Sequence, residues 1–69
     1  MHYRVDVLIQ GEENFMTYRG YAESELMAAE DAYAWYFGGN DQLDVFVDSV
    51  SSKVFKTQDK SITFFVNPL

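Results

Sequence analysis

Carboxylates are the most abundant side chains with acid–base chemistry in this chain, and several lie close together in the sequence. The pairs are Glu12 with Glu13, Glu23 with Glu25, and Glu30 with Asp31. Two carboxylates that share a site can split their pKa values and act as general acid and general base. Adjacent residues on a helix, however, diverge by about 100° around its axis. Glu30 and Asp31 are therefore predicted to form a solvated face and not a catalytic pair.

Nucleophilic catalysis and metal binding are not predicted either. The single imidazole belongs to His2, at the chain terminus, where segments commonly fray. One histidine, no cysteine and no acidic calcium-binding loop do not supply a metal-ligand set. The one glycine pair, Gly38-Gly39, follows the predicted helix, whereas a phosphate-binding glycine loop precedes one. We therefore expect a protein that is not an enzyme and that has no cofactor and no metal site.

The charge of the chain is acidic and unevenly distributed. Eleven acids and five bases among 69 residues give a net charge of −6 and a pI near 4.3, which argues against direct binding of nucleic acid. Residues 20–52 contain seven acids and no lysine or arginine. Charge of one sign on one region attracts basic protein surfaces and speeds encounter with them. The plainer alternative is that the acids serve only solubility.

Alternating and helical patterns predict the elements that hold these residues. Period-2 alternation indicates a strand from residue 2 to 9, with Tyr3, Val5 and Val7 on its buried face. The polar segment 10–14 predicts a turn into a second strand over 15–21. Further strands are expected over 43–50, with an acidic outer face, and over 53–56 and 61–66, which form a C-terminal hairpin.

A single helix is expected from Ser24, a favourable N-cap, to Phe37, which Gly38-Gly39 follows as a left-handed stop. Its apolar stripe is predicted to pack on the sheet and consists of Leu26, Ala29, Tyr33, Tyr36 and Phe37. The fold class expected is α+β, an antiparallel sheet of four to five strands in the order ββαβββ with one helix on one face. At this length the chain forms one domain, residues 1–69.

The sequence contains no signal peptide at Met1 and no long uncharged apolar window, so a cytoplasmic protein without membrane attachment is expected. Trp35 lies at the flank of the helical stripe, within the acidic region. It either folds over the sheet edge to complete a small core or stays exposed as an anchor for a protein partner.

One segment resembles a known family. Tyr21-Ala22-Glu23-Ser24, followed by Ala28, Ala32 and Tyr36, is similar to the strand-to-helix segment of the small early RNA-polymerase inhibitors of some podophages. The match covers under half the chain, and the run from Lys56 to Leu69 has no counterpart there. In size, acidity and lack of catalytic residues the chain is also similar to anti-CRISPR proteins. Both resemblances imply a non-catalytic, phage-encoded inhibitor, and the first implies that Glu23 contacts a basic partner surface.

The function expected is thus inhibition of a host nucleic-acid-binding complex, a CRISPR effector or an RNA polymerase, by acidic charge mimicry in the host cytoplasm. The candidate partner-binding residues combine carboxylates with aromatic contact area: Glu23, Glu30, Asp31, Trp35, Tyr36, Asp44 and Asp48. The alternative is a self-associating assembly module in which the strand over 61–66 is an exposed edge. A monomer or a weak homodimer is expected.

Overall fold

One antiparallel sheet and one helix make up the part of the chain that the structure, a computed structural model, describes: residues 1–38, 47–48 and 53–69. The elements are β1 (His2–Ile9), β2 (Met16–Tyr21), α1 (Glu25–Phe37), β3 (Val47–Asp48), β4 (Val54–Lys56) and β5 (Ile62–Pro68). Their order along the chain and the single helix confirm the predicted α+β class. Of the strand predicted over 43–50, only Val47–Asp48 lies within the described residues.

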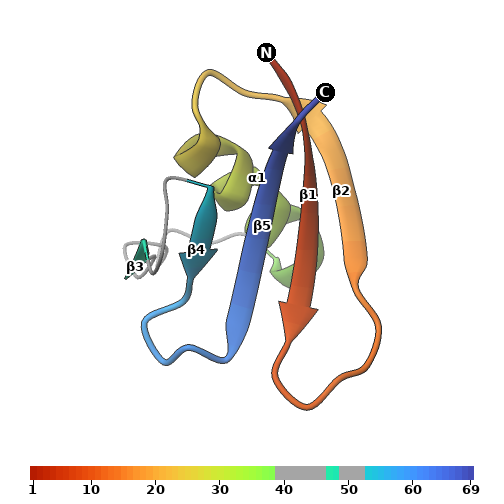
Figure 1. Ribbon diagram of the computed structural model, residues 1–69, viewed down its shortest axis with the longest axis vertical. Helices are drawn as coiled ribbons and strands as arrows, with labels where there is room; N and C mark the ends of the chain where they lie inside the picture. The colour runs from red at the N-terminus through yellow and green to blue at the C-terminus, as the bar shows by residue number, and fades with distance from the viewer. Residues whose placement is uncertain (39–46, 49–52) are drawn as a thin grey trace.

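The spatial order of the strands is β2-β1-β5-β4-β3, and every neighbouring pair is antiparallel (Figure 1). The two predicted hairpins are confirmed, because β1 pairs with β2 and β4 pairs with β5. The expectation that residues 61–66 form an exposed edge is wrong, since β5 lies between β1 and β4. Its side chains are apolar on both faces over Phe64, Phe65 and Val66, which is typical of a strand inside a sheet.

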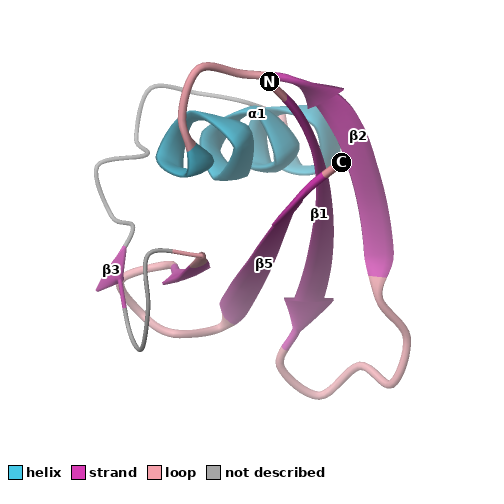
Figure 2. Ribbon diagram, turned by 45° about the horizontal axis from the view of Figure 1, so that its top comes forward, coloured by secondary structure: helices cyan, strands magenta, loops and turns pink. Residues whose placement is uncertain are grey.

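The ends of α1 are fixed by the residues that the sequence suggested. Ser24 is the N-cap, and its hydroxyl accepts a hydrogen bond from the Met27 amide at 3.2 Å. Gly38 has a left-handed φ of 87° and donates its amide to the Ala34 carbonyl at 3.2 Å. The helix lies across one face of the sheet, and no described element covers the other face (Figure 2). No helix among the described residues is long and apolar enough to span a membrane.

The core lies between α1 and the sheet. Strand alternation buries Tyr3, Val5 and Val7, as predicted, and the register places Phe64 and Val66 of β5 beside Val7 and Val5 on the same face. The helix contributes three buried alanines, Ala28, Ala29 and Ala32, and its Tyr33, Tyr36 and Phe37 are partly buried against the core.

The predicted helical stripe is therefore wrong at its first position. Leu26 is 42% exposed, while Ala28 and Ala32, outside the predicted stripe, are buried. Alanines let the helix backbone approach the sheet closely, and the aromatic residues near the C-terminal end of α1 fill the remaining space. The other four positions of the predicted stripe are confirmed, because Ala29 is buried and Tyr33, Tyr36 and Phe37 pack against the core.

A compact turn joins β4 to β5. One oxygen of Asp59, Oδ1, accepts hydrogen bonds from the Thr57 hydroxyl at 2.7 Å, the Ser61 hydroxyl at 2.7 Å and the Ser61 amide at 3.0 Å. These bonds, above all the two from Ser61, lower the pKa of Asp59 to about 2. Lys60 takes a left-handed φ of 64° in the same turn.

Candidate protein-binding surface

The charged residues of α1 are acidic, whereas the opposite face of the sheet carries several bases together with one acid, Asp6. Within α1 the charged residues are Glu25, Glu30 and Asp31, all acidic. The strand register places Arg4 opposite Arg19 and aligns both with Asn67, on the face away from the helix. Lys56 is on that face too, through its pairing with Thr63. The described part of the chain is therefore polarised in charge across its thickness.

Trp35 is the most exposed of the large hydrophobic residues in the described part of the chain, at 72%. Its ring lies beside that of Tyr18 on β2, with 6.4 Å between the centroids and 49° between the planes. Together with Thr17 and Arg19 these two rings line a shallow depression of about 370 Å³. Of the two alternatives left open by the sequence, the structure places Trp35 at the surface.

Asp31 lies one helical turn before Trp35 and adds charge to this region. Burial raises the pKa of Tyr18, and the carboxylate of Asp31 raises it further. Gly20 leaves room for the Tyr18 ring, since a Cβ at residue 20 would lie 2.6 Å from the Tyr18 hydroxyl oxygen. We call the group of Asp31, Trp35, Thr17, Tyr18 and Arg19 the Trp35 surface.

Tyr36 has a different role from its neighbour. Its side chain is half-buried, and its hydroxyl donates a hydrogen bond of 2.6 Å to the Thr17 carbonyl oxygen. This bond ties the last turns of α1 to β2 and so positions Trp35 over Tyr18. Tyr36 thus acts on the Trp35 surface by holding it in place.

The other predicted site residues are placed as follows. Glu23 is exposed directly before the N-cap, and Glu30 is half-buried on α1. Asp44 lies outside the described residues. Asp48 belongs to β3, where its backbone pairs with Phe55. The structure therefore brings Asp31, Trp35 and Tyr36 together at β2.

Sequence reasoning missed the contribution of β2, namely Thr17, Tyr18 and Arg19. The alternation over 16–21 already placed Tyr18 and Arg19 on opposite faces of one strand. The pattern does not contain the strand order. In the structure β2 is an edge strand, and Trp35 lies beside it.

The residues with catalytic potential are dispersed in the described part of the chain. Glu12 and Glu13 are exposed in the loop between β1 and β2. His2 is held in β1, and its ring meets the Tyr21 ring edge-on at 5.5 Å. No group of three or more potential metal ligands occurs among the residues that the structure describes.

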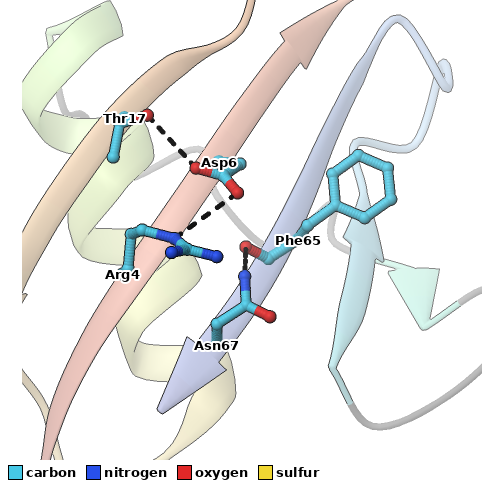
Figure 3. Close-up of polar contacts among 5 residues, drawn as sticks. All are labelled: Arg4, Asp6, Thr17, Phe65 and Asn67. Atoms are coloured by element: carbon cyan, nitrogen blue, oxygen red, sulfur yellow. Dashed lines mark hydrogen bonds and ion pairs between the residues drawn. The ribbon is translucent and has the colours of Figure 1, made fainter. Parts of the chain in front are cut away.

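The uncovered sheet face has its own polar network, shown in Figure 3. Asp6 accepts a hydrogen bond from the Thr17 hydroxyl at 3.1 Å and pairs with the Arg4 Nε at 3.6 Å. The neighbouring Asn67 donates to the Phe65 carbonyl at 3.4 Å. Asp6 thus supplies a counter-charge to Arg4.

Comparison of the chain with protein-family models, with curated proteins and with solved structures finds no match.

Proposed function

We propose that this protein is a non-catalytic, phage-type inhibitor that docks its acidic helix side on a basic, nucleic-acid-binding surface of a host protein complex. The observation that carries the proposal is the 72% exposure of Trp35 on a helix whose charged residues are all acidic. Exposed tryptophans with charged neighbours are typical anchors of protein interfaces.

The charge arrangement supports this orientation of docking. Glu23, Glu30 and Asp31 approach the partner with Trp35, while Arg4 and Lys56 lie on the other face of the sheet. Carboxylates presented to a lysine- and arginine-lined channel replace the phosphates that it normally binds, and they accelerate encounter. A CRISPR effector is the first candidate partner and an RNA polymerase the second.

The experiment begins with capture of host proteins by the tagged protein at low and at raised salt, followed by mass spectrometry. Capture alone is not sufficient, so the isolated partner is then tested for binding of its DNA or RNA with increasing amounts of the protein. The proposal expects stoichiometric, salt-sensitive loss of nucleic-acid binding.

Charge reversal locates the contact. The double variant Glu30→Lys with Asp31→Lys should weaken partner binding by about 10-fold or more and flatten its salt dependence, because it places like charges against a basic surface. The matched control is Glu12→Lys with Glu13→Lys, which changes the net charge equally in the loop between β1 and β2 and should retain most of the binding. The pair Asp44→Lys with Asp48→Lys extends the test to the rest of the acidic region. If all three double variants bind the partner as tightly as the wild-type protein does, charge mimicry is contradicted.

A further inference from the structure

The outer edge of β2 has unused backbone hydrogen-bonding groups. Met1 and Ala22 exchange two hydrogen bonds. The Ala22 amide donates to the Met1 carbonyl oxygen at 3.0 Å, and the Met1 amino group donates to the Ala22 carbonyl oxygen at 3.1 Å. In an antiparallel pair, hydrogen-bonded and non-hydrogen-bonded positions alternate. Tyr21, Arg19 and Thr17 are therefore non-hydrogen-bonded positions toward β1, and their amides and carbonyls point away from the sheet.

Only some of the outward backbone groups of this edge have a hydrogen-bond partner within the molecule. The Thr17 carbonyl is occupied by the Tyr36 hydroxyl at 2.6 Å. Among the described residues, the backbone groups of Arg19 and Tyr21 have no hydrogen-bond partner on the outer side. Such groups can accept a further strand, which forms main-chain hydrogen bonds with the edge.

The side chains next to this edge define what the added strand must carry. Arg19 is exposed, lies directly opposite Arg4 in the β1–β2 register, and has no ion-pair partner among the described residues, because Asp6 pairs with Arg4. Like charges placed opposite each other are unfavourable. An acidic side chain opposite Arg19 on a new strand would relieve this repulsion.

The same arrangement makes one pairing with a second copy of the chain unfavourable. Antiparallel pairing of two β2 edges centred on residue 19 would put Arg19 opposite Arg19, next to Arg4 of each copy. On the helix side of the sheet, an added residue opposite Tyr18 enters the depression lined by Tyr18 and Trp35. That position suits an apolar side chain.

From these observations we infer that the β2 edge binds an extended segment of a partner protein, in which an acidic residue pairs with Arg19 and a neighbouring apolar residue contacts Trp35. This contact deepens the proposed function, because Trp35 belongs to both. It adds main-chain pairing at the sheet edge to the docking of the acidic helix.

The test uses a displayed library of random heptapeptides selected on the intact protein, so that the partner need not be known. The expected peptides contain an acidic residue beside an apolar one. In the ¹⁵N-labelled protein, a selected peptide should slow amide exchange at Arg19 and Tyr21 by about 10-fold or more, while the amides of Tyr18 and Gly20, already bonded to β1, change little.

Two variants of Arg19 separate the backbone from the side chain. Arg19→Pro removes an outward amide without breaking a bond to β1, a position where edge strands tolerate proline, and should reduce peptide affinity by about 10-fold or more. Arg19→Glu keeps the amide and should select peptides with a basic residue in place of the acidic one. Thermal unfolding followed by circular dichroism verifies that each variant is folded. If Arg19→Pro does not fold, Arg19→Glu alone tests the inference.

Failure of this inference is distinguishable from failure of the proposed function. Glu23→Lys with Glu30→Lys should leave peptide affinity within about threefold of wild type, because those two carboxylates belong neither to the edge nor to the Trp35 surface. The inference is overturned if no peptide is enriched, if Arg19→Glu selects the same peptides as wild type, or if the protein alone forms a dimer in which the Arg19 amide is protected.

Discussion

Replacing Trp35 with alanine should weaken partner binding more than it lowers the stability of the fold. A buried aromatic side chain covers roughly 150–250 Å², and Trp35 is 72% exposed, so only about 40–70 Å² is removed from water. At about 25 cal/mol per Å² this area is worth about 1–2 kcal/mol. Alanine favours the helix over tryptophan by about 0.5 kcal/mol, which offsets part of the loss.

The net cost in unfolding free energy is therefore about 0.5–1.5 kcal/mol, equivalent to a fall in Tm of about 2–12 °C for a domain of this size. An interface anchor contributes more, about 2 kcal/mol or above, so the partner Kd should rise by about 30-fold. Urea unfolding followed by far-ultraviolet circular dichroism measures the first quantity, since the variant lacks the single tryptophan of the chain. Calorimetric titration of the isolated partner measures the second.

The control is Phe15→Ala, which removes another exposed aromatic ring, one that contacts Phe65 instead of Trp35. Because Phe15 is 56% exposed and lies outside the helix, its replacement should lower stability by about 1.5–3 kcal/mol, at least as much as Trp35→Ala, and leave the partner Kd unchanged. A loss above about 3 kcal/mol for Trp35→Ala, as for a core aromatic residue, would refute the surface position of Trp35. An unchanged Kd would refute its role as an anchor.

Three further predictions concern the fold. Phe64→Ala should cost about 3–5 kcal/mol in urea unfolding, because Phe64 is fully buried at the centre of the sheet; a loss below 1 kcal/mol would argue against β5 as a central strand. Gly38→Ala should cost about 1 kcal/mol, since φ is 87° at this helix end, and an unchanged Tm would argue against the left-handed cap. The folded-state pKa of Asp59 is lowered from 3.8 to about 2, so its stabilising contribution is complete above pH 3.8 and is lost as the pH falls through about 2. Asp59→Asn should remove that component of acid unfolding, and a carboxyl titration by NMR with a midpoint near 3.8 would contradict the hydrogen bonds from Thr57 and Ser61.

Much of the secondary structure could be predicted because its signals are local. The alternation in β1, the Ser24 cap and the Gly38 stop each specify a backbone conformation within a few residues. Strand order is not local, and the sequence pattern therefore predicts an edge position for β5, which the structure corrects. The continuous apolar run Phe64-Phe65-Val66 was the one signal for a central strand.

The candidate site was predictable only on the helix. The sequence identified Asp31 and Trp35 from charge and from position on the stripe, but left two environments open for Trp35. The choice between them depends on the spacing of α1 and β2, which small residues set: Ala28 and Ala32 on the helix are buried, and Gly20 on the strand leaves room for the Tyr18 ring. The sequence contains no signal for the role of Arg19 at the β2 edge, because that role depends on Arg4, its partner on the neighbouring strand.

The pairing of β1 with β5 determines how the chain can fold. These neighbours come from opposite ends of the sequence, Leu69 donates its amide to the His2 carbonyl at 2.9 Å, and both termini lie at the same end of the sheet (Figure 1). The central ladder thus closes a loop of most of the chain, which raises contact order and slows folding. During synthesis, β1 can pair with β2 early, but its second edge stays unpaired until residues 62–68 have left the ribosome.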